Sequence, residues 1–395
     1  MMLPAWDEAE GSARARAVFA AHFDGEPTGV WSAPGRVNLI GEHTDYNGGL
    51  CLPIALEHRT YVALRRRRDD AIHLFSEREG SAWQSTLTDI APGAVSGWGA
   101  YPAGVAWALG ELGQATGGFD AAVASCVPYG AGLSSSAALE CAFAMAFAAA
   151  PGWTGPDPDT DAGRAELAGA CVRAENEIAG ANTGGMDQAA ALRAQPGHAL
   201  LLDTRDASVR HIPFDLTASG LELLVIDTRA EHALVDGQYA QRRATCEAAA
   251  AALSVATLRE ITPADLGAAL DRLDSEEARR RVRHVVTEIA RVEQFVALLA
   301  ADRVGEVGPL MDASHTSLAT DYEVSCEELD VAVTAAREAG ALGARMTGGG
   351  FGGSAIALVP AGSGPEVAHS VTAAFAAAGF TPPAFLTATA AAPAH

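Results

Sequence analysis

A glycine- and serine-rich segment between an apolar run and an alanine-rich run constrains the fold of this chain most strongly. Residues 127–138 read VPYGAGLSSSAA. A glycine turn that leads into a serine-rich helix start presents unpaired backbone N–H groups, and the helix dipole favours anions there. The segment therefore predicts a strand, a phosphate-binding loop and a helix, although an ordinary serine-capped helix has the same pattern. It is not a Walker A loop, because it lacks that spacing and the lysine.

The rest of the chain mixes short apolar runs, bounded by turn residues, with longer helical periodicity. The runs at 29–40, 51–64 and 71–76 predict strands. The residue patterns also predict helices at 15–22, 98–112, 135–149, 162–178, 237–253, 278–301, 305–318 and 326–339. Ser325 and Glu328 have the spacing of a capping box for the last helix. Strands mixed with runs of helices indicate an α+β fold.

The length and composition indicate a globular protein of two domains. The chain has 395 residues, of which 49% are hydrophobic and 19% charged. The net charge of −22 argues against nucleic acid and anionic membranes as partners, since both would be repelled. Six scattered cysteines without a Cys-x-x-Cys pair, and no signal peptide or spanning segment, make the cytoplasm the expected compartment.

Lysine is absent from the whole chain, so that every basic residue other than histidine is arginine. This absence excludes a Walker A lysine, the ATP-site lysine of protein kinases and Schiff-base chemistry on lysine. An anionic substrate such as ATP would need a locally positive or dipolar site in this acidic protein. The basic run Arg65 to Arg68, followed by Asp69 and Asp70, is interpreted as the exposed tip of a hairpin.

A second polar cluster follows the first predicted strand, in the sequence PGRVNLIGEHTDYNGG at residues 34–49. Glu42, His43 and Asp45 can converge on one ligand only from a loop, because alternation along a strand would send neighbours to opposite faces. Carboxylates and an imidazole suit the hydroxyl groups of a sugar. A metal site and a plain solvated turn remain alternatives.

A third glycine segment, RMTGGGFGGS at residues 345–354, formally contains Gly-x-Gly-x-x-Gly. A dinucleotide-binding fold needs a helix after this motif, yet residues 354–359 have the pattern of a strand. A glycine hairpin whose backbone packs closely against another element, and which could cover a nucleotide, is the alternative.

In chain order, the loops at 34–49, 127–138 and 345–354 resemble the three signatures of the GHMP kinases, and the loop at 34–49 resembles the signature specific to galactokinases. Further matches to the same family are WxxYxxGV at 98–105, AENE at 174–177, GGMDQ at 184–188, DGQY at 236–239 and HxSLxxDYEVSC at 315–326. The similarity runs from about Trp31 to the last predicted strand. Gly185 and the pair Asn182-Thr183 depart from many members of the family.

The resemblance implies a two-lobed GHMP kinase fold with the active site between the lobes. Residues 1–205 would form an N-terminal lobe like ribosomal protein S5 domain 2, and residues 206–395 a ferredoxin-like C-terminal lobe. The implied activity is that of a galactokinase, an ATP-dependent phosphorylation of the C1 hydroxyl of α-D-galactose that feeds galactose catabolism. Kinases for N-acetylgalactosamine or L-arabinose, and a non-catalytic sugar sensor, are the alternatives.

The resemblance also assigns roles to residues. Arg36 and Asp187 would be the catalytic pair, in which Asp187 accepts the proton of the anomeric hydroxyl and Arg36 orients the carboxylate. The sugar-binding residues would be Glu42, His43, Asp45, Gly184 and Tyr239. Trp98 would flank the adenine, and the phosphates would lie on Gly130, Ala131, Gly132, Leu133, Ser134, Ser135 and Ser136. Ser136 and Glu175 would bind Mg²⁺.

Overall fold

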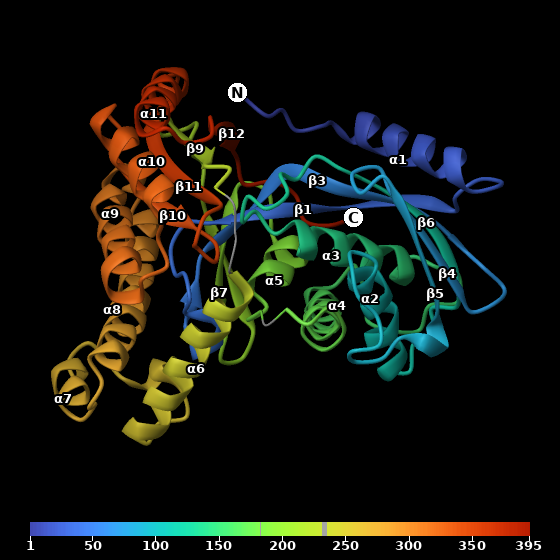
Figure 1. Cartoon of the computed structure of the whole chain (residues 1–395), viewed down its shortest axis with the longest axis horizontal. Helices are drawn as coiled ribbons and strands as arrows, with labels where there is room; N and C mark the ends of the chain where they lie inside the picture. The colour runs from blue at the N-terminus through green and yellow to red at the C-terminus, as the bar shows by residue number, and fades with distance from the viewer. Residues whose placement is uncertain (182, 231–234) are drawn as a thin grey trace.

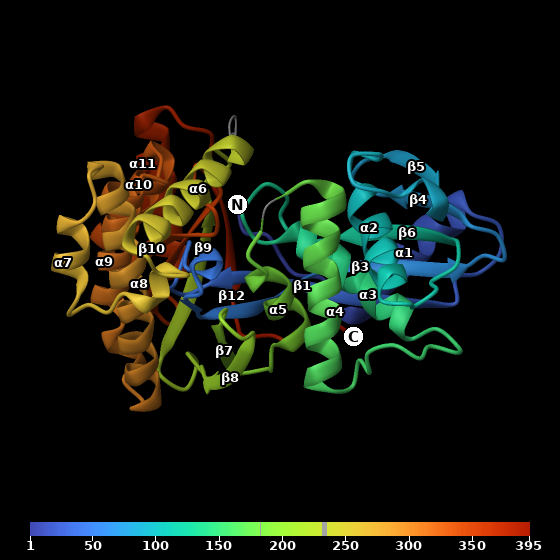
Figure 2. The same cartoon turned by 90° about the horizontal axis from the view of Figure 1, so that it is seen from below.

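The computed structural model describes residues 1–181, 183–230 and 235–395, without the side chains of residues 235 and 236. Asn182, and the side chain of Asp236 in the DGQY match, therefore lie outside the described residues. Two lobes lie side by side (Figures 1 and 2). Each lobe is built on its own sheet, with helices packed against it.

The N-terminal lobe is built on a mixed five-stranded sheet. In spatial order its strands are β1 (Gly29–Asn38), β3 (Pro53–Arg66), β6 (Phe119–Ser125), β4 (Ala71–Ser76) and β5 (Ser81–Thr86). Helix α1 (Glu8–His22) covers one face, and the other face carries α2 (Ala100–Glu111), α3 (Ser135–Ala148) and α4 (Asp161–Arg173) (Figure 1).

Alternation along β3 explains the two layers. Tyr61 and Ala63 pack in the small core under α1, whereas Val62 and Leu64 pack in the larger core with α2, α3 and α4. Successive side chains of a strand point to opposite faces. A strand that is apolar at both parities can therefore hold helices on both sides of its sheet.

The basic run at Arg65 to Arg68 is not the tip of a hairpin, so that interpretation is wrong. Strand β6 lies between β3 and β4, and β4 pairs with β6 in parallel. Asp120 on β6 is buried and accepts hydrogen bonds from Arg65 at 2.6 Å and Arg67 at 2.9 Å. These ion pairs join the basic run to the central strand.

The C-terminal lobe is built on an antiparallel four-stranded sheet in the order β10 (Gly343–Thr347), β11 (Ser354–Pro360), β9 (Leu221–Asp227) and β12 (Ala384–Ala388). Its helices are α6 (Val235–Leu253), α7 (Leu266–Asp271), α8 (Glu276–Ala300), α9 (Gly308–Ser317), α10 (Glu327–Glu338) and α11 (Gly364–Ala378) (Figure 2). A small third sheet has the order β2 (Leu50–Cys51), β7 (His198–Asp203) and β8 (Ser208–Pro213).

Two details refine the sequence predictions. The proposed lobe boundary after residue 205 falls in the turn between β7 and β8, inside the small sheet. The predicted capping box at α10 is absent, because Cys326 is the N-cap and the Ser325 hydroxyl donates to Asp330 at 2.5 Å. In the described chain, no helix combines the length and apolar character needed to cross a bilayer.

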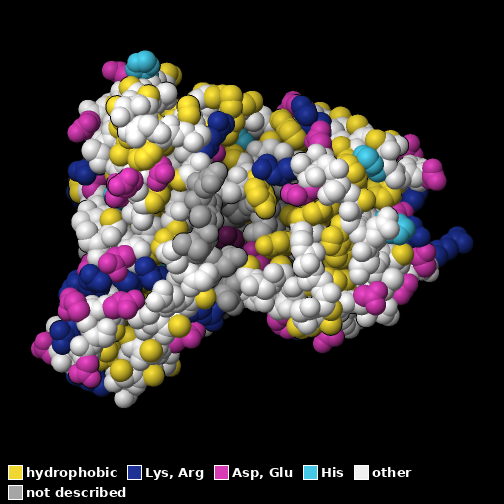
Figure 3. Space-filling model, in the orientation of Figure 1, with side chains coloured by type: hydrophobic (Ala, Val, Ile, Leu, Met, Phe, Trp, Pro, Cys, Tyr) yellow, Lys and Arg dark blue, Asp and Glu magenta, His cyan; other side chains and the backbone are white. Residues whose placement is uncertain are grey.

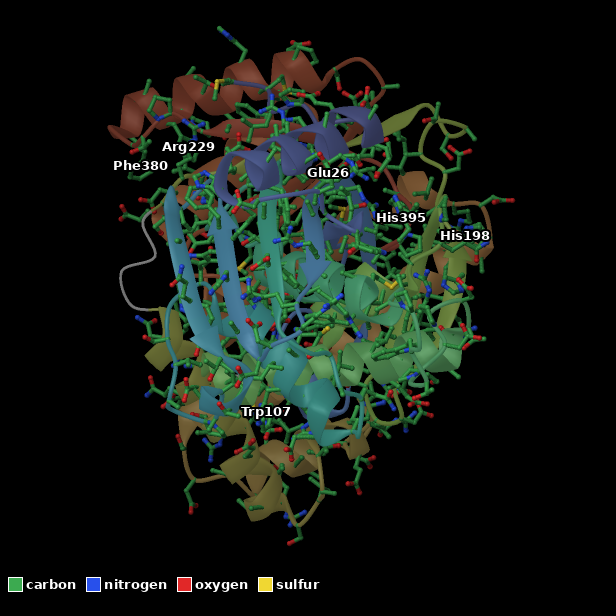
Figure 4. All side chains as sticks on the ribbon, turned by 90° about the vertical axis from the view of Figure 1, so that its right-hand side faces the viewer. Glu26, Trp107, His198, Arg229, Phe380 and His395 are labelled. Atoms are coloured by element: carbon green, nitrogen blue, oxygen red, sulfur yellow. The ribbon has the colours of Figure 1, made fainter. Side chains whose placement is uncertain are left out.

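Each end of the chain packs on the lobe built by the other end. Met2 pairs in parallel with Phe385 of β12, at the edge of the C-terminal sheet. In the opposite direction, residues 389–395 run along the N-terminal lobe, where His395 and Ser32 exchange backbone hydrogen bonds of 2.9 and 2.8 Å. His395 accordingly lies near the five-stranded sheet in Figure 4. Ala394 is fully buried in the core of that lobe.

Candidate active site

A cavity of about 740 Å³ lies where the two lobes meet, and Figure 3 shows the molecule hollowed there. The predicted site residues line this cavity with one exception. Those that line it are Arg36, Glu42, His43, Asp45, Trp98, Gly130, Gly132, Leu133, Ser134, Ser135, Ser136, Glu175, Gly184, Asp187 and Tyr239. The exception, Ala131, is fully buried in the core, and its carbonyl accepts a hydrogen bond from Ser354 at 2.7 Å.

Arg36 and Asp187 form a bidentate ion pair in this cavity. The Arg36 Nε and Nη2 groups donate to the two carboxylate oxygens of Asp187 at 2.8 and 2.9 Å. A break in the β1–β3 register between Pro34 and Arg36 re-aims the arginine side chain. Asp187 lies in the first turn of α5 (Met186–Arg193). The bidentate contact fixes the orientation of the carboxylate.

The turn before Asp187 depends on two glycines. A Cβ atom at Gly184 would collide with the Asp45 carboxylate. Gly185 has a φ of 90° and is the N-cap of α5. Glycine adopts this left-handed conformation without strain, so the departure of Gly185 from the family pattern suits the backbone that positions Asp187.

The predicted phosphate loop joins the catalytic pair to helix α3. Arg36 Nη1 donates to the Gly132 carbonyl at 2.6 Å, and the Ser134 hydroxyl donates to Asp187. Ser134 is the N-cap of α3, with a φ of 59°, and makes no side-chain cap. The first-turn N–H groups of α3 therefore begin beside Asp187, where the helix dipole favours an anion.

Glu175 lies in a π-helical turn, Ala174–Ala179, beside the start of α3. Burial raises its pKa to about 7, and the nearby charge of Asp187 adds to this, while a hydrogen bond from Ser136 acts in the opposite direction. Gln188 donates to Glu175 at 2.5 Å and to the buried Glu140 at 3.1 Å. The Glu175 carboxylate and the Ser136 hydroxyl are hard oxygen donors, which Mg²⁺ prefers.

Asp45 forms no ion pair with another described residue, in contrast to Asp187, which pairs with Arg36. Burial, followed by the nearby charge of Asp187, raises its pKa to about 6. Asp45 begins a short 3₁₀ turn, Asp45–Asn47, and its carboxylate lies against Gly184. Its carboxylate accepts hydrogen bonds from the backbone N–H groups of Asp45 and Tyr46 and also lines the cavity, where it can accept from hydroxyl groups of a ligand.

His43 is fixed by a chain of hydrogen bonds. Its Nδ1 lies 2.7 Å from the Tyr46 hydroxyl, which lies 2.9 Å from the Tyr322 hydroxyl, and that group lies 3.1 Å from the Cys246 sulfur. Burial, followed by His284, lowers the pKa of His43 to about 3, so the imidazole is neutral. Tyr239 from α6 packs beside it, with ring centroids 5.4 Å apart.

Glu42 has a different environment from the neighbours with which it was grouped. One carboxylate oxygen accepts from Arg345 at 2.5 Å and from Asn38 at 2.8 Å. The other accepts from the Gly348 N–H at 2.9 Å and from the Thr347 hydroxyl at 3.2 Å. Glu42 therefore links β1 to β10 with its carboxylate, and this use of its oxygens does not favour the metal-site alternative.

The third glycine segment is a hairpin turn between β10 and β11, as the alternative interpretation predicted. A Cβ atom at Gly348 would lie 2.8 Å from the Gly132 carbonyl oxygen. The two glycine loops thus pack backbone against backbone. The turn covers one side of the cavity and contributes Gly348, Gly349 and Gly350 to its wall.

Several residues that build the site were missed by the sequence reasoning. Gln188 directly follows Asp187 in the GGMDQ match, which could have identified it, but nothing in the sequence connects it to Glu140. Tyr46 and Tyr322 lie inside quoted motifs without an assigned role. Arg78 and Tyr129 also line the cavity, where the Arg78 guanidinium group lies over the Tyr129 ring.

Three family models match the chain. These are the galactokinase galactose-binding signature at residues 17–66, the GHMP kinases N terminal domain at 100–195 and the GHMP kinases C terminal model at 295–377. The galactose-binding signature includes Arg36, Glu42, His43 and Asp45, and the N-terminal model includes Asp187.

Curated relatives cover nearly the whole chain. A galactokinase of Streptomyces coelicolor is 50% identical over 92% of this chain and 93% of its own length. A galactokinase of Mycobacterium tuberculosis is 47% identical over 90% of this chain and 95% of its own. The human galactokinase is 42% identical over 92% of each chain.

Solved structures agree with this grouping. A Lactococcus lactis galactokinase in complex with galactose has a TM-score of 0.88 and 30% identity, covering 96% of this chain and 98% of its own. The mevalonate kinase of Methanococcus jannaschii has a TM-score of 0.63 at 16% identity, covering 94% of this chain and 100% of its own, and thus shares the fold. The predicted two-lobed GHMP kinase fold is confirmed. With identities of 42–50% to curated galactokinases over about nine-tenths of its length, this chain belongs to the galactokinase family of GHMP kinases.

Proposed function

We propose that this chain transfers the γ-phosphoryl group of ATP to the C1 hydroxyl of α-D-galactose, forming galactose 1-phosphate and ADP. The observation that carries the proposal is the bidentate Arg36–Asp187 pair, which lies between the sugar-loop residues and the start of α3 in one cavity. Phosphoryl transfer depends mainly on positioning and charge stabilisation. One cavity with a carboxylate base between two binding loops meets that need.

Asp187 serves as the general base in this proposal. Its oxygens are held by Arg36 and by the Ser134 hydroxyl, so the carboxylate has a fixed direction before substrate binds. Asp187 accepts the proton of the anomeric hydroxyl, and the oxygen of that hydroxyl attacks the γ-phosphorus with ADP as the leaving group. Arg36 orients the carboxylate through its two hydrogen bonds and provides positive charge near the transferred group.

The sugar lies against the loop residues. Asp45 accepts hydrogen bonds from sugar hydroxyl groups, His43 and Tyr239 form the adjoining wall, and Gly184 leaves room for the ring. Glu42 lines the same wall, tied by its carboxylate to Arg345. The buried polar partners favour one epimer, because a hydroxyl in the wrong position leaves them unpaired.

The nucleotide lies along the start of α3, with its phosphates on residues 130–136 and its adenine against Trp98. Ser136 and Glu175 would hold Mg²⁺, with water and phosphate oxygens as the remaining ligands. When bound, the ion supplies charge neutralisation for the polyphosphate. No group of three or more His, Cys, Asp or Glu side chains among the described residues is placed to hold a metal, which suits an ion carried by the nucleotide.

The proposal includes a reducing compartment such as the cytoplasm. All six cysteines of the chain are free thiols, and four of them are buried. Disulfides are rare in reducing compartments, so this pattern supports the proposed location. Fractionation of the source cells would test it.

A coupled ADP-release assay over galactose, glucose, N-acetylgalactosamine, L-arabinose and mevalonate tests the activity. We expect galactose to be preferred over its epimer glucose by about tenfold or more in kcat/KM, since one unsatisfied buried polar group costs about 1–3 kcal/mol. Equal turnover of the two epimers would contradict the proposal. Preference for N-acetylgalactosamine or L-arabinose would assign a related kinase, and galactose binding without ADP release would assign a sensor.

A further inference from the structure

The cavity has an acidic lining, although the proposed co-substrate is a polyanion. Its ionisable lining residues comprise five carboxylates and two guanidinium groups: Glu42, Asp45, Glu79, Glu175, Asp187, Arg36 and Arg78. His43 is neutral. Because the chain has no lysine, a positive contact for the phosphates must come from arginine, from a metal ion or from backbone N–H groups.

One of the two arginines is already committed to other contacts. Arg36 uses Nε and Nη2 on Asp187 and Nη1 on the Gly132 carbonyl. Its charge is balanced by the carboxylate that it orients. A triphosphate that entered the cavity would have to compete with Asp187 for this guanidinium group.

Arg78 is in the opposite situation. Within the described chain, no carboxylate forms an ion pair with Arg78, and the preceding residue, Glu77, lies 4.0 Å from Arg14 instead. The guanidinium carbon of Arg78 lies 4.3 Å from the centroid of the Tyr129 ring. Arg78 therefore lines the cavity with a charge that no protein carboxylate balances.

The Tyr129 ring explains where this guanidinium group is held. Tyr129 directly precedes Gly130 of the phosphate loop, and 62% of its surface is exposed, which is unusual for a large aromatic residue. A cation–π contact at an exposed site contributes about 0.5–1 kcal/mol. That energy is enough to favour one position of a long side chain while leaving its N–H donors available.

Arg78 comes from the turn between β4 and β5, outside all three matched family models. Trp98, which precedes α2, and Tyr101, in the first turn of α2, also line the cavity. The contact between Arg78 and Tyr129 thus joins the turn between β4 and β5 to the residue that precedes the phosphate loop, in the wall of the cavity.

We propose that Arg78, held against the face of Tyr129, is a nucleotide-binding residue that contacts the phosphates of the bound nucleotide. The inference rests on the proposed function, since it assumes that a nucleotide occupies the part of the cavity beside Tyr129 and the phosphate loop. The guanidinium group offers several donors to phosphate oxygens. Tyr129 positions that group through the face of its ring.

Calorimetric titration of the full chain with ATP, ADP and adenosine, in the absence of sugar, tests the inference. We expect Arg78→Ala to weaken ATP and ADP binding about tenfold, the range of one charge-assisted contact, and to leave adenosine binding unchanged. The dependence of ATP affinity on salt should also become less steep. Arg68→Ala is the matched control, because Arg68 is an exposed arginine of the same lobe that does not line the cavity.

A second substitution isolates the stacking contact. Tyr129→Leu should weaken ATP binding by a smaller factor, and it should have no further effect once Arg78 is alanine, because the ring then has nothing to position. Unchanged ATP affinity in Arg78→Ala would overturn the inference, as would an equal loss for adenosine, which would mean base stacking. Failure of the unmodified chain to bind ATP would contradict the proposed function itself.

Discussion

The wall of the cavity is made of bonded, buried side chains at the sugar end and largely of backbone and exposed side chains at the nucleotide end. At the sugar end, buried side chains bond to one another across the lobes, as Glu42 does with Arg345 and Tyr46 with Tyr322. At the nucleotide end, the wall consists of glycine backbone, the start of α3 and exposed side chains such as Arg78 and Tyr129. The sugar end is therefore formed before ligand binds, whereas the nucleotide end, apart from the contact of Gln188 with Glu175, offers donors without a fixed network.

This difference shows that two carboxylates in one cavity can have unrelated tasks. Glu42 has four protein donors and stabilises the frame, while Asp45 forms no ion pair with another described residue and lines the cavity, where it can contact a ligand. Substitutions at the sugar end should affect stability and specificity together. Those at the nucleotide end should affect binding and leave stability unchanged. Four substitutions test the comparison.

The largest effect is expected where the two ends meet. Asp187→Asn keeps the size and an acceptor oxygen but cannot take a proton, so kcat should fall by about 10²–10⁴-fold. Galactose affinity should change little. Steady-state kinetics measures kcat, and calorimetry measures the affinity for galactose. Asp161→Asn is the control, because Asp161 is an exposed carboxylate that pairs with Arg193 and does not line the cavity. A kcat near that of the unmodified chain would leave Asp187 as a helix-starting residue alone, since Asn caps a helix almost as well.

The next effect concerns the frame at the sugar end. Glu42→Gln leaves Arg345 buried without its main counter-charge, so the free energy of unfolding should fall by about 3–5 kcal/mol. Urea denaturation measures this value. Glu10→Gln, which breaks an exposed pair with Arg14, should cost less than about 1 kcal/mol. If Glu42→Gln lost galactose binding at full stability, Glu42 would be a ligand contact and not a frame residue.

Asp45 should show the opposite behaviour. Because its folded-state pKa is raised to about 6, the folded chain binds a proton more tightly than the unfolded chain. Its contribution to stability therefore falls as pH rises from about 4 to about 6, by roughly 3 kcal/mol. Asp45→Asn lacks this term, so its stability relative to the unmodified chain should rise over that window and stay level above it.

Denaturation at pH values from 4 to 8 tests this expectation. In the same variant, kcat/KM for galactose should fall about tenfold or more, because a hydroxyl partner is changed. If the difference in stability between Asp45→Asn and the unmodified chain did not depend on pH, the folded-state pKa of Asp45 would not be raised. It would place Asp45 with Glu42 in the frame.

The smallest effect is expected for the proposed metal contact. Glu175→Gln removes one of two protein oxygens offered to Mg²⁺, so the Mg²⁺ concentration at half-maximal activity should rise severalfold. Direct titration with metal-free ADP should give an unchanged affinity, which separates loss of the metal from loss of the nucleotide. An unaltered Mg²⁺ requirement, or full activity in EDTA, would remove Glu175 from the metal site.

The sequence predicted the loops of this site better than the contacts between them. Local sequence signals predict the phosphate loop, the turn at residues 42–45 and the glycine hairpin. Glycine, serine and clustered polar residues determine the conformation of the backbone only within a few residues along the chain. Glu42 was grouped with His43 and Asp45 for the same reason. Its partner Arg345 lies 303 positions away in the sequence, and no local pattern can predict a contact between residues so far apart.

Sheet order was beyond local signals in the same way. The interpretation of Arg65 to Arg68 as a hairpin tip assumed that the consecutive strands β3 and β4 pair with each other. Instead, β6 lies between them in the sheet, and its buried Asp120 accepts a hydrogen bond from Arg65. Helix α1 begins at Glu8, earlier than predicted, because Asp7 caps it by accepting from the Glu10 N–H. That cap was present in the sequence as Asp7 followed three residues later by Glu10 and could have been found.

The exchange of chain ends between the lobes has a consequence for the order of folding. Residues 390–395 leave the ribosome after all the strands and helices of the C-terminal lobe, yet Ala394 belongs to the core of the N-terminal lobe. The buried guanidinium group of Arg59 donates to the carbonyls of Ala392 and Pro393 at 2.9 and 2.8 Å. During synthesis, the Arg59 guanidinium group therefore lacks these two acceptors until residues 392 and 393 have been made. The N-terminal lobe therefore reaches its final packing last, although it is made first, and the two lobes should unfold as one cooperative unit.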